Sequence, residues 1–258
     1  MDPNPMTART LFHALALPLI AAMALAGPLR ATAEAGDFIG VVELFTSQGC
    51  SSCPPADAEL AKMADKGNVL ALSYHVDYWN YLGWVDTLAS KASTERQYGY
   101  AHTLKRKNVY TPQAVVNGRD HANGADPAAV NALINKLSAI DEGLNVTVDA
   151  AYDNDGLTIS IGEGEGKADI VVVYFDDSNT VDITRGENAG STITYRHSVR
   201  DIETVGMWNG TAKSLTLPAS VLSAKAGTGC AILLQVVGRD GSPGAILGAA
   251  MITSDETG

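Results

Sequence analysis

The sequence predicts an α/β domain followed by a small antiparallel β-sandwich, and three observations lead to this fold class. Residues 38–140 alternate between strand-like and helix-like patterns. From Leu144 onward the helical pattern stops, and short strand-like runs are separated by turn residues. The N-terminal segment has a composition of its own. We therefore divide the chain into residues 1–35, 36–141 and 142–258.

The first segment has the three parts of a secretory signal peptide. Arg9 supplies a positive charge, Leu11–Leu25 is almost wholly apolar, and small residues follow at Ala31–Ala33. The apolar run is shorter than the ~20 residues that cross a bilayer, and Pro18 interrupts it. An ordinary N-terminal helix is the alternative. We expect residues 1–35 to be cleaved, leaving a periplasmic or secreted protein with no membrane attachment.

The charge of the chain argues against nucleic acid as a partner. The formal net charge is -11, and the isoelectric point is near 4.8. The densest basic patch, Lys105–Lys107, is too short to form a phosphate-binding face. We therefore look for a site that acts on proteins or small molecules.

The α/β half is expected to contain four strands and three helices. Strands are predicted at Phe38–Phe45, Val69–Val76, Gln113–Val116 and Arg119–Ala122, and helices at Pro54–Lys66, from Thr87 or Ser90 to Lys107, and at Pro127–Ile140. The first two strands must be parallel because a helix connects them. Asn117–Gly118 is a strong hairpin signal between the last two strands.

The second half is expected to be a sandwich of short strands. They are predicted at Leu144–Tyr152, Leu157–Ile161, Ile170–Phe175, Val181–Thr184, Thr192–Val199, Lys213–Leu217 and Cys230–Val237. The stretch Tyr195–Arg200 combines aromatic and polar residues, which a packed strand with one solvated face explains.

The three cysteines define the candidate chemistry. Cys230 has no evident partner and lies in an apolar run, so we expect a buried core thiol. Cys50 and Cys53 form a CxxC motif between the first strand and the first helix. At a helix N-terminus the backbone amides favour a thiolate. Cys50, on the exposed side, would then be the nucleophile, and Cys53 the resolving thiol.

Several neighbours of the motif weaken this chemistry. Pro54 and Pro55 follow the second cysteine directly, so the regular helix can begin only near Pro54, farther from Cys50. Asp57 and Glu59 would disfavour a nearby thiolate. A permanently oxidised, structural disulfide therefore remains an alternative, because exported proteins retain disulfides.

The order of strand, CxxC and helix, followed about 60 residues later by Thr111–Pro112, resembles the thioredoxin superfamily. The resemblance implies a thioredoxin fold for residues 36–141. It also implies that Pro112 is a cis-proline beside the dithiol and that the backbone of Thr111 contacts the substrate.

A narrower resemblance covers most of the mature chain. It rests on Thr46–Asp57, His75–Trp79, Gly83–Trp84 and Tyr110–Gln113, which are similar to an uncharacterised family of secreted bacterial thioredoxin-like proteins. This resemblance implies a fold and a compartment, but it brings no established reaction.

Polar and aromatic residues at the end of the second strand complete the candidate site. His75 and Asp77 are candidates for a proton shuttle, and Trp79 for one wall of a substrate groove. His75 could instead join Cys50 and Cys53 in holding a soft metal such as Cu(I). The simpler alternatives are a histidine that hydrogen-bonds its own loop and an aromatic residue that covers the sheet edge.

These observations support three hypotheses for function. The first is an exported thiol-disulfide oxidoreductase that uses Cys50 and Cys53 on a protein or small-thiol substrate and needs no cofactor. The second is a soft-metal (copper) binding or delivery protein. The third is a non-catalytic binding module with a structural disulfide. Fold alone does not choose among them.

Overall fold

The structure, a computed structural model, describes residues 1, 31–32, 38–153, 156–218 and 229–253. The predicted signal peptide therefore lies almost entirely outside the described residues. The exceptions are Met1 and the two-residue strand β1 (Ala31–Thr32), which pairs with β6. No helix in the described ranges is long and apolar enough to cross a membrane.

The first half contains the predicted strands and helices, with modest shifts at their ends. The strands are β2 (Val41–Thr46), β3 (Leu70–His75), β4 (Gln113–Val116) and β5 (Asp120–Asn123). The helices are α1 (Pro54–Lys66), a short 3₁₀ helix η1 (Asn80–Leu82), α2 (Lys91–Thr103) and α3 (Pro127–Ala139). Local signals set these bounds: Ser90 and Asp126 cap α2 and α3, and Gly67 ends α1 in the left-handed region.

The second half is all strand, but its strands are longer than expected. They are β6 (Val148–Asp153), β7 (Gly156–Ile161), β8 (Ala168–Ile183), β9 (Ser191–Trp208), β10 (Lys213–Pro218), β11 (Gly229–Val237) and β12 (Pro243–Thr253). β8 joins two runs that the sequence separates, and β12 was not predicted.

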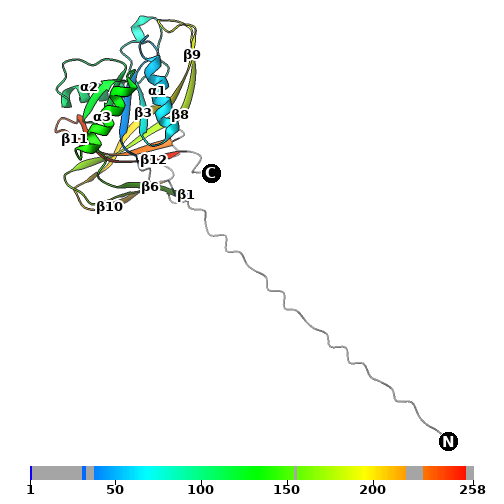
Figure 1. The fold of residues 1–258 in the computed structure, drawn as a ribbon, viewed down its shortest axis with the longest axis vertical. Helices are drawn as coiled ribbons and strands as arrows, with labels where there is room; N and C mark the ends of the chain where they lie inside the picture. Colours follow the sequence, from blue (N-terminus) through cyan, green and yellow to red (C-terminus); the bar gives the residue numbers. More distant parts are fainter. Residues whose placement is uncertain (2–30, 33–37, 154–155, 219–228, 254–258) are drawn as a thin grey trace.

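The predicted fold class, a thioredoxin fold followed by a separate small sandwich, is wrong. Strands from both halves form one mixed eight-stranded sheet in the order β12-β11-β8-β9-β3-β2-β4-β5. The junction is a parallel pairing between β3 and β9 at Ser73 and Ser198. A second sheet, in the order β1-β6-β7-β10, packs on the first. The chain is mostly β, as Figure 1 shows.

The composition of β8 gives the physical reason for this difference. Residues 170–175 are continuously apolar, which is typical of a strand buried on both faces rather than of a sandwich strand with one solvated face. Ile170, Val172 and Tyr174 pack against β6 and β7, whereas Val171 and Val173 belong to a second cluster. A strand with two apolar faces needs cover on both sides, and joining the larger sheet provides it.

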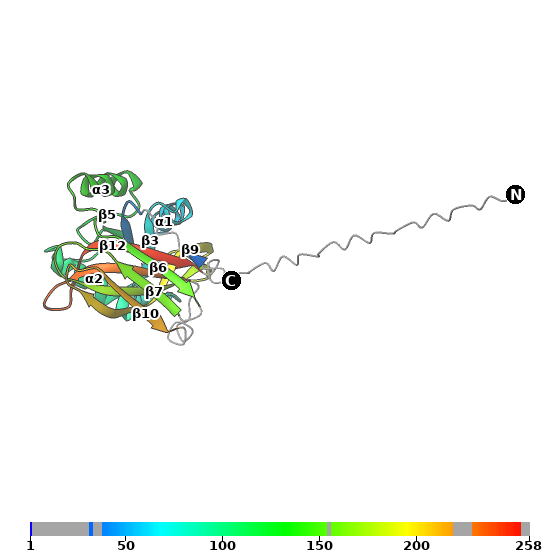
Figure 2. The same cartoon turned by 90° about the horizontal axis from the view of Figure 1, so that it is seen from below.

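Three apolar clusters fill the space around the large sheet. On one face, α1 and α3 cover β2 and β4 through residues such as Leu44, Leu60 and Ile134. On the other face, Tyr100 of α2 packs with Val41 and with residues of β8 and β11. Figure 2 shows α1 and α3 on the same side of the strands. Every residue of β2 and β3 is buried as a result.

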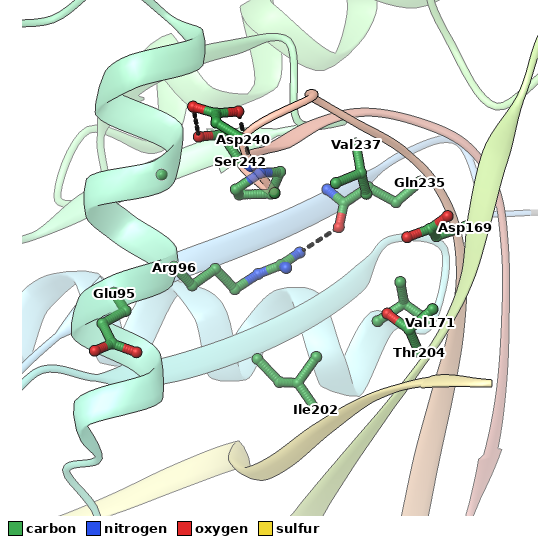
Figure 3. A pocket seen from close by; sticks show the side chains of 13 residues that line it. Glu95, Arg96, Asp169, Val171, Ile202, Thr204, Gln235, Val237, Asp240 and Ser242 are labelled. Atoms are coloured by element: carbon green, nitrogen blue, oxygen red, sulfur yellow. Dashed lines mark hydrogen bonds between the residues drawn. The ribbon is translucent and has the colours of Figure 1, made fainter. Parts of the chain in front are cut away.

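A charged network is also buried beneath α2. Arg96 donates from Nε to Glu43 of β2 at 2.7 Å and from Nη2 to Gln235 of β11 at 2.9 Å. Tyr100 donates its hydroxyl hydrogen to the same Glu43 carboxylate. The network borders a cavity of about 460 Å³ between α2 and β8, β9 and β11, in which Figure 3 shows Arg96 reaching toward Gln235. Because it links a helix to strands of both halves, this network ties the two halves together.

Candidate functional site

The CxxC motif lies where the sequence places it, between a buried strand and a helix. β2 ends at Thr46, and α1 begins at Pro54 with Cys53 as its N-cap residue. The amide of Cys53 donates to the carbonyl of Cys50 at 3.1 Å, which closes a tight turn. A disulfide joins the two cysteines, with their Cα atoms 5.4 Å apart.

Both cysteines are buried. Cys50 is 2% exposed and Cys53 is fully buried, so the exposure expected of Cys50 is not observed. A buried disulfide fits a structural bond between β2 and α1. By itself, the bond demonstrates no redox reaction.

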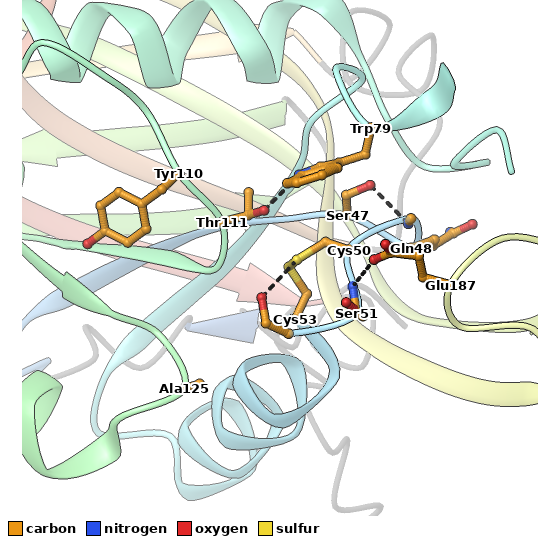
Figure 4. Close-up of a disulfide and its surroundings, with 12 residues drawn as sticks. Ser47, Gln48, Cys50, Ser51, Cys53, Trp79, Tyr110, Thr111, Ala125 and Glu187 are labelled. Carbon is orange, nitrogen blue, oxygen red and sulfur yellow. Dashed lines mark hydrogen bonds between the residues drawn. A yellow bond between two sulfur atoms is a disulfide. The ribbon is translucent and has the colours of Figure 1, made fainter. Parts of the chain in front are cut away.

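Two of the predicted substrate-binding residues, Trp79 and Thr111, lie beside the disulfide, as Figure 4 shows. Trp79 donates from Nε1 to the hydroxyl of Thr111 at 2.8 Å. The Thr111–Pro112 peptide bond is cis, as the resemblance to the thioredoxin superfamily implies. Trp79 and Thr111 thus form one side of the site.

His75 lies at the end of β3 and pairs with Asp86, a residue that the sequence did not single out. Its Nδ1 is 2.8 Å from Oδ2 of Asp86, and both side chains are buried. The Asp86 carboxylate also accepts from the amides of Gln48 and Leu88 at 2.8 Å. Burial raises the pKa of Asp86, but His75 and these amides outweigh it and lower the pKa below the usual value. Asp86 thereby holds both His75 and the chain just before the CxxC motif.

Asp77, the other predicted member of the shuttle, is engaged elsewhere. Its Oδ1 accepts from the hydroxyl of Thr94 at 2.7 Å, and its amide donates to the same hydroxyl oxygen at 3.1 Å. Asp77 therefore ties the loop after β3 to α2. The structure brings His75 to Asp86 and leaves Asp77 bonded to the helix.

Four buried side chains around the CxxC motif have polar atoms for which the described part of the chain provides no hydrogen-bond partner within normal bonding geometry. These atoms are both carboxylate oxygens of Asp57, Nε2 of His75 and the hydroxyl oxygens of Thr46 and Tyr195. The ring of Tyr195 packs edge-on against His75, with their centroids 4.6 Å apart. Buried polar groups are normally hydrogen-bonded, so a group of atoms of this kind is typical of a functional site.

Asp57 is the most unusual member of this group. It lies one helical turn after Cys53, and its amide donates to the carbonyl of Cys53 at 3.1 Å. Burial raises the pKa of Asp57 to about 7, although His75 and Thr46 lower it. A carboxyl group that is protonated near neutral pH can donate a proton, and this one lies on the same helix as a cysteine of the disulfide.

Sequence patterns do not single out two of these residues, Asp57 and Tyr195, as members of a site. In the sequence, Asp57 reads only as a charge that disfavours a nearby thiolate. Tyr195 belongs to a stretch assigned to an ordinary packed strand, and it reaches His75 because β9 pairs with β3. The only signal for Asp57 was its four-residue spacing from Cys53, which places both on one helical face.

The remaining cysteine, Cys230 in β11, lies apart from this site. Cys230 is a free thiol at the edge of the cluster under the second sheet, and burial raises its pKa to about 12. Within the described ranges, no group of three or more His, Cys, Asp or Glu side chains could hold a metal ion. The alternative set of Cys50, Cys53 and His75 would need the disulfide to be reduced first, because thiolates are the ligands.

Comparisons with known proteins give a family but no activity. The chain is 52% identical to a protein of Agrobacterium tumefaciens with a crystal structure, at a TM-score of 0.79, with 86% of this chain and 96% of that chain covered. HBP35 of Porphyromonas gingivalis is 16% identical, with a TM-score of 0.57 over 84% of this chain and 75% of that one, a likeness of fold alone. No curated protein matches the chain. Residues 41–235 match the DUF1223 family. The chain therefore belongs to DUF1223, a family of proteins of unknown function.

Proposed function

We propose that the protein is an exported thiol-disulfide exchange protein in which Cys50 and Cys53 react and Asp57 supplies the proton. The observation that carries the proposal is the buried, protonatable Asp57 one helical turn from Cys53. A structural disulfide needs no such group, and burying a carboxyl group away from water costs stability. The order of β2, CxxC and α1, with Thr111 beside the disulfide, supports a distant relationship to the thioredoxin superfamily in this part of the chain.

The exchange step balances with residues of this chain. A substrate thiolate attacks Sγ of Cys50, a sulfur–sulfur bond forms to the substrate, and the Cys50–Cys53 bond breaks. Cys53 leaves as a thiolate and takes the proton of Asp57. A second substrate thiol then loses its proton and attacks the substrate sulfur of the mixed disulfide, and Cys50 leaves as a thiolate and takes up that proton. The substrate is oxidised to a disulfide, and the protein is reduced to a dithiol.

His75 is suited to reload Asp57 with a proton. Asp86 accepts a hydrogen bond from Nδ1 of His75, which leaves Nε2 as the acceptor in the neutral ring. His75 and Asp57 interact electrostatically. We therefore assign His75 the role of taking up, at Nε2, the proton that a substrate thiol loses on ionising, and of passing this proton to Asp57 rather than directly to the cysteines.

The reduction potential of the Cys50–Cys53 pair tests this function. We expect a value between roughly -120 and -270 mV, the range of working exchange dithiols. Glutathione or dithiothreitol buffers followed by thiol labelling and mass spectrometry give the value, and a Cys230→Ser variant removes the third thiol from the measurement. A potential below roughly -300 mV would contradict exchange.

The second candidate function is a binding module with a structural disulfide. The burial of both cysteines favours it, because a covered disulfide is protected from reduction. A potential below roughly -300 mV is the result that this candidate predicts.

The role of Asp57 predicts a pH-dependent rate. We expect Asp57→Asn to slow reduction of the disulfide by a phosphine roughly tenfold at pH 6. This effect is smaller than that of most general acids, because a thiolate is a good leaving group even without a proton. The effect should shrink above pH 7, where Asp57 of the wild-type protein is already ionised. Rates of free-thiol formation at pH 6 and pH 8 give this ratio. Glu59→Gln on the same helix is the control, and equal ratios at the two pH values would refute the role of Asp57.

A further inference from the structure

The β8–β9 hairpin projects beyond the body of the large sheet. We call residues 176–198 the arm; its strands pair with each other from Asp176 and Ser198 to Ile183 and Ser191. β9 pairs with β3 at Ser73 and Ser198, at the base of the arm. Figure 1 shows this hairpin extending along α1. The turn of the arm, residues 184–190, therefore lies far from the second sheet and close to the CxxC motif.

A bend at the base of the arm fixes its direction. His197 has a φ of 46°, which is uncommon for a residue other than glycine. Its Nδ1 is 2.8 Å from the carbonyl oxygen of Ala71 in β3. Farther along, Arg196 forms an ion pair with Asp65 of α1 at 3.4 Å. These contacts direct the arm over α1 and toward the disulfide.

The turn of the arm is bonded directly to the CxxC loop. The side-chain amide of Asn188 donates from Nδ2 to the carbonyls of Gln48 at 2.9 Å and Cys50 at 3.0 Å. The amide of Ser51 donates to Oε2 of Glu187 at 3.3 Å, as Figure 4 shows. Residues separated by about 140 positions thus meet on the loop that carries Cys50.

Besides these hydrogen bonds, the turn approaches the chain closely at Gly186, where an added side chain would meet Cβ of Trp84. All residues from 184 to 190 are exposed except Asn188, which is half-buried. A turn without buried apolar side chains is expected to open locally at a small cost in free energy. Cys50, in contrast, is 2% exposed while the turn is attached. Access to the sulfur therefore requires a movement, and the exposed turn is a segment that can make this movement.

We propose that the turn of the β8–β9 arm is a latch on the disulfide, held by Asn188, and that its release admits a thiol to Cys50. The latch controls access to the disulfide of the proposed function, and its biological role rests on that function. It also explains how a reactive disulfide is protected from unspecific reduction: the Asn188 amide holds two carbonyls of the loop that carries the buried Cys50, and breaking these bonds frees the loop to expose the sulfur.

The rate of reduction tests the latch. A water-soluble phosphine supplies two electrons and becomes its oxide with oxygen from water, while the disulfide becomes two thiols. We expect Asn188→Ala to react roughly tenfold faster than the wild-type protein, because two hydrogen bonds no longer hold the closed state. Glu187→Gln, which keeps an acceptor oxygen without the charge, should react only about twofold to threefold faster.

Asn179→Ala is the matched control, because Asn179 lies in the same arm and its side-chain amide donates to Asp176 within the arm. It should react within about twofold of the wild-type rate. Hydrogen exchange should also speed up in peptides covering residues 48–51 and 184–190 of Asn188→Ala, but not in β3. A wild-type rate for Asn188→Ala, or equal acceleration in Asn179→Ala, would overturn the latch.

The latch and the proposed function fail separately. The latch determines a rate of reduction, whereas the proposed function predicts an equilibrium potential. A potential too low for exchange together with a fast Asn188→Ala variant would reject exchange and keep the latch.

Discussion

Replacing Arg96 by alanine is expected to lower the free energy of unfolding by about 3–5 kcal/mol, because it leaves Glu43 charged and unpaired in the core. Glu43 is fully buried in β2, and the side chain of Arg96 is 8% exposed. Arg96 also bonds Gln235 of β11, so its loss weakens the link between the two halves of the sheet. Denaturant unfolding followed by circular dichroism measures the change.

A double replacement separates the unpaired charge from the loss of packing. Glu43→Leu combined with Arg96→Met removes both charges and keeps similar volumes, and such exchanges are often neutral or stabilising. We expect it to recover more than half of the stability that Arg96→Ala loses. If the double variant is less stable than Arg96→Ala, the ion pair is a net source of stability.

Asp57 is expected to make the protein less stable as the pH rises. Its pKa is about 7 in the folded protein, against a usual value of 3.8. Between these values the folded state holds a proton that the unfolded state has released, so stability falls as the pH rises from about 4 to about 7 and is constant above. The full effect amounts to about 4 kcal/mol for this buried group.

The Asp57→Asn variant removes this dependence because an amide does not ionise. Relative to the wild-type protein, we expect it to gain about 2–3 kcal/mol of stability between pH 5 and pH 8. Denaturant unfolding at the two pH values measures the gain, and Glu59→Gln on the same helix is the control. A difference that is equal at both pH values would show that Asp57 keeps an ordinary pKa.

The local elements of the first half were predictable because their signals are local. Pro54 and Pro55 mark the start of α1, Gly67 its end, and Asn117–Gly118 the hairpin between β4 and β5. The pairing of Cys50 with Cys53 followed from their spacing. Each of these features depends on neighbours within a few residues, so the local sequence determines it whatever the rest of the fold is.

The arrangement of the second half was not predictable for the opposite reason. Periodicity indicates that residues 170–175 form a strand, but it does not state which strand they join or whether one or both faces are covered. The pairing of β3 with β9 links residues 125 positions apart, Ser73 and Ser198. Such a pairing depends on the whole core, because it buries the second face of β8 and β9.

The features of the candidate site also fall into those that local sequence determines and those that long-range contacts determine. The sequence by itself determined the CxxC motif, the strand and helix that hold it, and the presence of His75, Trp79 and Thr111 nearby. Only the tertiary structure decided that His75 pairs with Asp86, that Asp57 is buried beside Cys53, and that Asn188 lies on the loop of Cys50. Residue type and spacing fix what a side chain can do, whereas burial and long-range contacts fix its protonation and its access to a substrate.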